Sequence, residues 1–188
     1  LTNSAWISIA IFGSLPFLLS DIDMSFVDAF FESTSGITTT GATVIENLEA
    51  KSHGILIWRA LLQWLGGVGI IVMALAVLPM LSIGGMQLFK TESYETPDKV
   101  VPKAASFAAG ISIVYITLTV IWAFMLWGAG MPIFDSIAHA MTTLATGGYS
   151  TKSESLAAFN SSTIEIIIIF GMLVGSLPFV HYLALTKN

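Results

Sequence analysis

Two short stretches of the sequence gather threonine and glycine within apolar surroundings. The first, SGITTTGATVIENLEA, covers residues 35–50 and follows the apolar run Phe26–Phe31. The second, MTTLATGGYSTKSE, covers residues 141–154. Backbone carbonyls and small hydroxyl groups offer oxygen ligands, and glycine permits dihedrals that a side chain would block. The chemistry favoured by this composition is the coordination of a partly dehydrated cation, with no covalent step.

A shift of 107 positions along the sequence relates the two stretches. Without gaps, it pairs Asp28 with Asp135, Thr39 with Thr146, Gly41 with Gly148 and Thr43 with Ser150. A lone cluster of threonine and glycine is usually an ordinary loop. Two copies in one register predict an internal duplication instead.

Long and short apolar runs alternate along the chain. The runs long enough to span a bilayer cover about Thr2–Leu19, Gly54–Phe89, Ala104–Trp127 and Thr163–Leu185. The second exceeds a bilayer core of roughly 30 Å, so we expect it to tilt, to protrude or to break, with Pro79 and Gly84–Gly85 as the break points. Phe26–Phe31 and Ile133–Leu144 are too short to span and lead into the threonine and glycine stretches. This length favours re-entrant helices, because polar backbone at membrane depth must be buried or line a water-filled path.

Local signals set the ends of these short helices. Ser25 and Asp28 form a capping-box-like start for the first helix, and Gly36 is expected to end it as a C-cap. Pro132 is expected in the first turn of the second helix. Each helix then directs its partly negative C-terminus at the polar stretch that follows, which favours a cation there.

The composition agrees with a membrane location. Of 188 residues, 55% are apolar and 10% are charged, whereas soluble domains carry about 25% charged residues. The net charge of −5 argues against a nucleic-acid partner. There is no cysteine, and the three histidines are widely spaced, so no transition-metal site is expected.

The lysines indicate an orientation. Four of them, Lys90, Lys99, Lys103 and Lys187, fall on one side of the predicted spans, and Lys51 and Lys152 fall on the other. The positive-inside rule makes the first side cytoplasmic, so both threonine and glycine stretches face outside. An acidic outer mouth that would attract cations is formed by Asp21, Asp23, Glu46, Glu49 and Glu154.

Arg59 and Gln63 lie one helical turn apart in the run that begins at Gly54. A charge inside a membrane helix is a functional candidate by default. Arg59 either reaches the interface or pairs with Glu32 of the first short helix, and we expect a structural pair. No nucleophile and base motif accompanies it, so the sequence does not predict an enzyme.

Three stretches resemble the Trk/Ktr/HKT family of potassium transporters, most closely its bacterial TrkH branch. They are FFESTSGITTTGATV (30–44), LLQWLGGVGIIVMALAVLPMLSIGGMQLF (61–89) and HAMTTLATGGYST (139–151). The resemblance implies an all-α membrane protein of the K⁺-channel-like type, in which four helix–pore loop–helix repeats surround one cation pore. This chain would hold two tandem repeats, residues 1–90 and 104–188, joined by a cytoplasmic linker at 91–103.

The resemblance also implies the filter residues, which would bind K⁺ through backbone carbonyls. They are Thr38, Thr39, Thr40, Gly41, Ala42 and Thr43 in the first repeat, and Ala145, Thr146, Gly147, Gly148, Tyr149 and Ser150 in the second. In plant relatives a serine in place of the first-filter glycine is associated with sodium selectivity, so Gly41 favours potassium. No cofactor other than the transported ion is implied.

Half of a four-repeat ring cannot enclose an ion. The expected partners are therefore the third and fourth repeats of the same transporter, a cytosolic nucleotide-binding regulatory subunit and, at full length, a second copy in a homodimer. The expected location is the bacterial inner membrane. Two alternatives stay open: a non-conducting structural or assembly membrane protein, and a half-size pore protein that dimerises.

Overall fold

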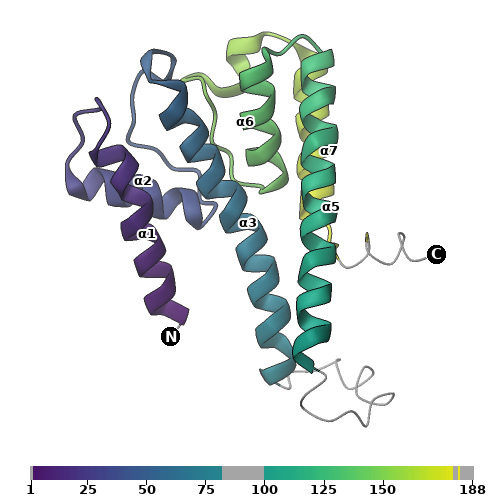
Figure 1. Cartoon of the computed structure of the whole chain (residues 1–188). Helices are drawn as coiled ribbons and strands as arrows, with labels where there is room; N and C mark the ends of the chain where they lie inside the picture. Colours follow the sequence, from purple (N-terminus) through teal and green to yellow (C-terminus); the bar gives the residue numbers. More distant parts are fainter. Residues whose placement is uncertain (1, 82–99, 180–181, 183–188) are drawn as a thin grey trace.

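The computed structural model describes residues 2–81, 100–179 and 182, and every regular element within these ranges is helical. The elements are α1 (Thr2–Leu18), α2 (Phe26–Ile37), η1 (Leu48–Ala50), α3 (His53–Leu81), α5 (Val100–Gly128), α6 (Ile133–Leu144), η3 (Ser155–Phe159) and α7 (Ser162–Ser176). The predicted all-α class is confirmed for the part of the chain described. Figure 1 shows the long helices α3 and α5 extending past the lower ends of α6 and α7.

Both short helices form near the residues that the sequence indicates. Ser25 is the N-cap of α2, and its hydroxyl oxygen accepts a hydrogen bond from the Asp28 N–H at 3.2 Å. The helix α6 has the bounds of the predicted run Ile133–Leu144. Pro132 is its N-cap, one position earlier than the first-turn place expected for it. Proline suits this place because its missing N–H would have no partner inside the helix.

Three boundaries differ from the predictions. Gly36 lies inside α2, whose last residue is Ile37 and whose C-cap is Thr38. The prediction that Gly36 is the C-cap is therefore wrong. The helix α7 ends at Ser176, because Leu177 takes an extended backbone before Pro178, and most of the remainder of the predicted run to Leu185 lies outside the described residues. The helix α3 continues through Pro79 to Leu81, so Pro79 as a break point is wrong, and the other predicted break point, Gly84–Gly85, lies outside the described residues.

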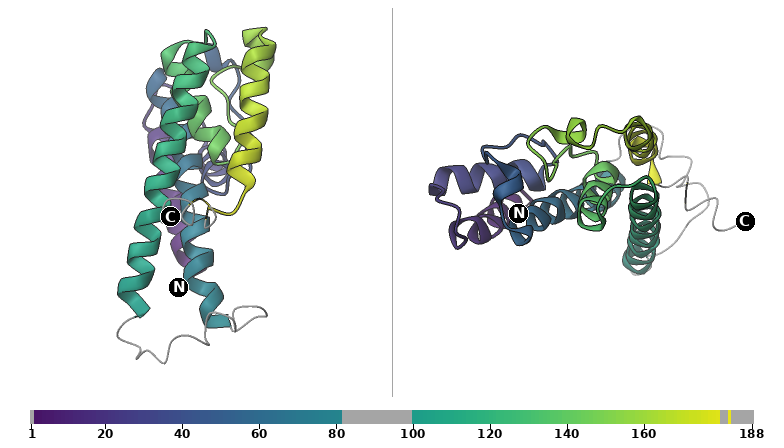
Figure 2. Two further views of the ribbon diagram at one scale, coloured as in Figure 1. Left: turned by 90° about the vertical axis from the view of Figure 1, so that its right-hand side faces the viewer. Right: turned by 90° about the horizontal axis from the view of Figure 1, so that it is seen from above.

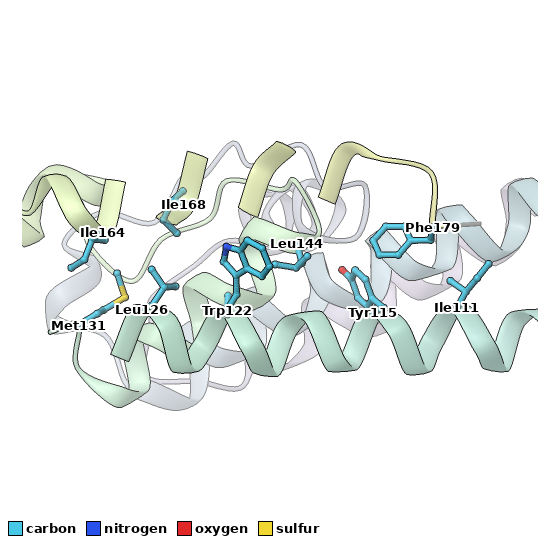
Figure 3. Close-up of a cluster of buried hydrophobic side chains, with 10 residues drawn as sticks. Ile111, Tyr115, Trp122, Leu126, Met131, Leu144, Ile164, Ile168 and Phe179 are labelled. Carbon is cyan, nitrogen blue, oxygen red and sulfur yellow. The ribbon is translucent and has the colours of Figure 1, made fainter. Parts of the chain in front are cut away.

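Each half of the described chain has its own hydrophobic core. Phe17, Ala29, Leu56 and Leu62 belong to the core formed by α1, α2, η1 and α3. The core of α5, α6 and α7 is shown in Figure 3. There Trp122 of α5 points toward Leu144, and Tyr115 of α5 points toward Phe179. A small cluster of Ala60, Ala138 and Met141 joins the two halves across α3 and α6.

The helix α6 lies at the centre of the second half. Seen from above in Figure 2, it sits between α3 on one side and α5 and α7 on the other, and it contacts all three. On the other side of α3, α2 contacts α1 and α3. Each short helix is therefore supported by longer helices on two sides, which positions the polar stretch at its C-terminal end.

Glycines permit the closest approach of long and short helices. A Cβ atom built on Gly66 of α3 overlaps the carbonyl oxygen of Ile37, the last residue of α2. A Cβ built on Gly175 of α7 lies 2.8 Å from the carbonyl oxygen of Leu144, the last residue of α6. Since small residues let membrane helices approach closely, both short helices end against a glycine of a longer helix.

The outer surface of the helices is largely apolar. Phe12 is 70% exposed on α1, and Ile113 and Phe124 are 65% and 63% exposed on α5. Within the described side chains, Ala108–Gly128 is the one helix segment long and apolar enough to cross a bilayer, and Ser4–Leu18 and Ser162–Ser176 are shorter apolar helices. Such a surface is suited to contact with lipid or with further apolar helices.

Candidate functional site

The twelve predicted filter residues fall in two stretches whose backbone dihedrals agree at corresponding positions. We name residues 38–43 the first segment, which follows α2, and residues 145–150 the second segment, which follows α6. Thr39 and Thr146 have φ of 55° and 51°, and Gly41 and Gly148 both have φ of 82°. Left-handed backbone is uncommon for a β-branched residue, so its occurrence at both threonines marks a constrained conformation.

The turns that lead into the segments also correspond. The N–H of Thr40 donates to the Ser35 carbonyl at 2.9 Å, and the N–H of Gly147 donates to the Thr142 carbonyl at 2.9 Å. The shift that pairs Gly41 with Gly148 in the sequence also pairs these two donors and these two acceptors. The register therefore describes matching backbone geometry and not only matching residue types.

Glu32 supports the first segment from the side of α2. Its carboxylate accepts hydrogen bonds from the Thr43 hydroxyl at 2.9 and 3.0 Å and from the Val44 N–H at 3.0 Å. His139 takes the corresponding place beside the second segment, with its Nε2 3.0 Å from the Ser150 hydroxyl. Different side chains thus fix the end of each segment to its own short helix.

Arg59 of α3 joins Glu32 to the second segment. Its Nε lies 2.8 Å from Glu32 Oε1, and its Nη1 donates to the Ser150 carbonyl at 2.9 Å. The guanidinium carbon lies 4.1 Å from the centre of the Tyr149 ring, in cation–π geometry. Arg59 and Glu32 are 1% and 0% exposed, so this ion pair is buried between the segments.

Tyr149 crosses back from the second segment to the first. Its hydroxyl is 2.8 Å from the Glu32 carbonyl and 3.2 Å from the Ala42 carbonyl, so one donor is shared between two acceptors. Ala42 also accepts from the Ser35 hydroxyl at 2.6 Å. The carbonyl of Ala42 is therefore held by residues from both halves of the chain.

The two segments meet directly at Gly41. A Cβ atom built on Gly41 overlaps the Gly147 carbonyl oxygen. The same construction on Gly148 finds none of the described residues within 4 Å. Gly41 consequently permits backbone-to-backbone contact between the segments, whereas the Cβ position of Gly148 has no such contact among the described residues.

Exposure differs between the segments. In the first segment Thr38, Thr40, Ala42 and Thr43 are exposed, and Thr39 and Gly41 are half-buried. In the second, only Thr146 and Gly148 are exposed, Ser150 is half-buried, and the remaining residues, Ala145, Gly147 and Tyr149, are buried. The second segment is enclosed because α3 covers one side of it.

Gln63 is a contact residue that the sequence did not single out for a role at the site. Its Nε2 donates to the Gly147 carbonyl at 2.8 Å, and its Oε1 accepts from the Tyr149 N–H at 3.1 Å. The available signal was its position one turn after Arg59 in an apolar helix. A buried polar side chain there requires polar partners, although the pattern alone does not say which.

The loops beyond the segments are tied together by Glu49. Its carboxylate accepts from both the Ser153 N–H and the Ser153 hydroxyl at 2.7 Å, and the hydroxyl oxygen also accepts from the Leu48 N–H at 3.1 Å. The hydrogen bond from the Ser153 hydroxyl, followed by that from its N–H, lowers the pKa of Glu49 from its ordinary value. The ionised form is therefore favoured in the folded loop.

This lowered pKa predicts a small dependence of stability on pH. A depressed folded pKa stabilises the protein above the ordinary glutamate pKa of about 4.3, and the stabilisation is lost as pH falls through the folded value. We expect Glu49→Gln to lower the melting temperature of the detergent-purified protein slightly at neutral pH, and the difference from the native protein to diminish at acidic pH, as the carboxylate of the native protein is protonated. Glu46→Gln, an exposed change on the same loop, is the control. An equal difference at both pH values would contradict the assignment.

Comparison with known proteins places these features in a family. The sequence model of the TrkH family, described as a cation transport protein, matches residues 1–187. The chain is 43% identical to the Trk system potassium uptake protein TrkI of Halomonas elongata over 190 residues, covering 100% of this chain and 38% of that protein. It is 45% identical to the Trk system potassium uptake protein TrkH of Salmonella typhimurium, covering 90% of this chain and 36% of that protein.

A solved structure agrees with these relatives. The crystal structure of the potassium transporter TrkH from Vibrio parahaemolyticus matches with a TM-score of 0.78 and 43% identity, covering 90% of this chain and 33% of that one. The chain thus spans 33–38% of the length of these relatives. The family is one of multi-pass membrane transporters and not of enzymes. On the match over residues 1–187, the chain belongs to the TrkH family of cation transport proteins.

Proposed function

We propose that this chain forms two of four helix–pore loop–helix repeats of a Trk-type potassium uptake protein. The first and second segments form part of its filter, and K⁺ is coordinated by those backbone carbonyls within residues 38–43 and 145–150 that do not accept hydrogen bonds from the surrounding side chains. The supporting observation is the pair of matched segments, each at the C-terminal end of a short helix and in contact through Gly41 and Gly147. The relatives that the chain matches are potassium uptake proteins by name.

The electrostatics of the site support a cation. The helices α2 and α6 are each 12 residues long and end directly before a segment. Their C-terminal carbonyls carry a partial negative charge, which favours a cation within about one turn of the helix end. Arg59 is paired with Glu32, so the nearest buried positive charge is neutralised rather than left to repel the ion.

The contact at Gly41 supports a ring of more than two repeats. The second segment covers Gly41 of the first, whereas none of the described residues covers Gly148. If successive repeats follow the same rule, a third segment covers Gly148. We therefore propose that residues 1–90 and 104–188 are repeats of a longer transporter, in which 91–103 is a cytoplasmic linker and both segments face outside the bacterial inner membrane.

The family resemblance extends this proposal to partners. A cytosolic nucleotide-binding subunit would dock on the side of the linker, and the complete transporter would form a homodimer. The exposed apolar side chains of α1, α5 and α7 would then contact lipid, the remaining repeats or the second copy.

The proposal predicts uptake of potassium by the complete transporter that contains this chain. Expressed in bacteria that lack their own potassium uptake systems, it should restore growth at low K⁺ and take up ⁸⁶Rb⁺. The 188-residue chain expressed alone should restore neither, because half a ring leaves the ion path open to lipid on one side. Absence of flux from the complete transporter would reject a conducting role. Flux through this chain alone would instead support a half-size pore that dimerises.

A further inference from the structure

The helix α3 holds the second segment through the side-chain amide of Gln63. The amide nitrogen donates to the Gly147 carbonyl at 2.8 Å, and the amide oxygen accepts from the Tyr149 N–H at 3.1 Å. Gln63 is fully buried, so water does not replace either partner. The amide of Gln63 thus bonds the C=O of Gly147 and the N–H of Tyr149. A residue of a neighbouring β-strand would use its own N–H and C=O in the same way.

Arg59 engages the same segment one turn earlier on α3. It donates to the Ser150 carbonyl at 2.9 Å and lies against the Tyr149 ring. The carbonyls of Gly147 and Ser150 are therefore committed to α3. The carbonyls that face the ion in this half of the filter must come from the other residues of the second segment.

The Gly147 carbonyl is also the point where the second segment touches the first. It contacts the position of Gly41, where a Cβ atom would overlap it. A shift of Gly147 toward or away from α3 would consequently change the distance between the two segments. In a filter this distance determines how closely carbonyl oxygens surround the ion.

The second half of the chain does not repeat this arrangement. Gly66 of α3 and Gly175 of α7 each contact the last carbonyl of a short helix, so α3 and α7 correspond when these two glycines are aligned. In that alignment Ile168 and Met172 take the places of Arg59 and Gln63. Among the described residues, polar attachment of a segment to a long helix through these two positions is thus found on α3 and not on α7.

We propose that Gln63 is a positioning residue that determines ion selectivity. With Arg59 next to it, it fixes the second segment at the spacing from Gly41 that suits K⁺. The inference rests on the proposed potassium pore, and it assigns part of the selectivity to a long helix of the first repeat rather than to the segments alone.

The test compares uptake of ⁸⁶Rb⁺ and ²²Na⁺ by the complete transporter in membrane vesicles. Gln63→Met keeps the length of the side chain but removes both hydrogen bonds. We expect the ratio of Rb⁺ to Na⁺ uptake to fall about tenfold, because a buried carbonyl and N–H lose their partners and the segment shifts. Gln63→Glu keeps an acceptor for Tyr149 and loses the donor to Gly147, so its ratio should also fall. Leu65→Ala, a change at a side chain that is 47% exposed on the same helix, should leave the ratio unchanged.

Each outcome bears on a different claim. A native transporter without Rb⁺ uptake would reject the proposed function itself. Native uptake with an unchanged ratio in Gln63→Met would reject only the role of Gln63. If both Gln63 variants were absent from the membrane while Leu65→Ala was present, the amide would serve assembly, and the selectivity role would likewise be rejected.

Discussion

Replacing Gly41 with alanine is expected to abolish potassium uptake by the complete transporter. The residue has φ of 82°, which costs an L-residue about 1–2 kcal/mol. In addition, the new methyl group would overlap the Gly147 carbonyl oxygen, which Gln63 holds in place. Because the Gly147 carbonyl is held by Gln63, the first segment must move away from the second to make room for the methyl group. Uptake of ⁸⁶Rb⁺ in potassium-uptake-deficient bacteria, normalised to the amount of protein in the membrane, measures the loss.

Gly130 supplies a matched control for this substitution. Its φ is 98°, and none of the described residues lies within 4 Å of a Cβ built on it, so Gly130→Ala adds strain without a collision. It should lower the melting temperature modestly and preserve uptake. Equal uptake in Gly41→Ala and Gly130→Ala would contradict the role assigned to the contact between the segments. Gly148→Ala extends the series, since it should be as harmful as Gly41→Ala if a third segment covers Gly148.

Local patterns predicted the parts of the fold that local interactions determine. Ser25 caps α2 because its hydroxyl oxygen accepts from the N–H three residues later. The spacing of Ser25 and Asp28 in the sequence predicts this contact. The constant shift between the two stretches anticipated the shared dihedrals of Gly41 and Gly148, because glycine marks positions where left-handed backbone is required. The prediction that Gly36 ends α2 was wrong because glycine near a helix end either terminates the helix or makes room for a neighbouring side chain. Here it gives room to Leu62, whose Cβ lies 2.9 Å from a Cβ built on Gly36.

The contacts between the halves could not be predicted in the same way. Arg59 and Ser150 are 91 residues apart, and the Tyr149 hydroxyl reaches a carbonyl 117 residues earlier. Such pairings depend on how α3 packs against α6, which no local pattern encodes. The sequence could show that Arg59, Gln63 and Glu32 needed polar partners in an apolar setting. It could not show that the second segment would supply both partners of Gln63 and one of the partners of Arg59.

The buried ion pair gives the other large expected effect. Arg59→Met should destabilise the complete transporter strongly, because it leaves the Glu32 carboxylate buried without its counter-charge. Removing one member of a buried pair costs about 3–5 kcal/mol. The same substitution also frees the Ser150 carbonyl and the Tyr149 ring, so both segments lose an attachment. Thermal unfolding in detergent and the amount of protein in the membrane should both report the loss.

The double variant Glu32→Gln with Arg59→Met should be more stable than Arg59→Met alone. A glutamine at position 32 carries no charge, and its side-chain oxygen can still accept from Thr43 and Val44, as the carboxylate does. Replacing both members of a buried pair is far less costly than removing one, so we expect recovery of about 2 kcal/mol. Glu46→Gln, an exposed change in the loop that follows the first segment, is the control and should have little effect with or without Arg59→Met. If the effects of Glu32→Gln and Arg59→Met simply added, the two charges would be acting independently, and the attachment of the segments would have to depend on Gln63 and Tyr149 instead.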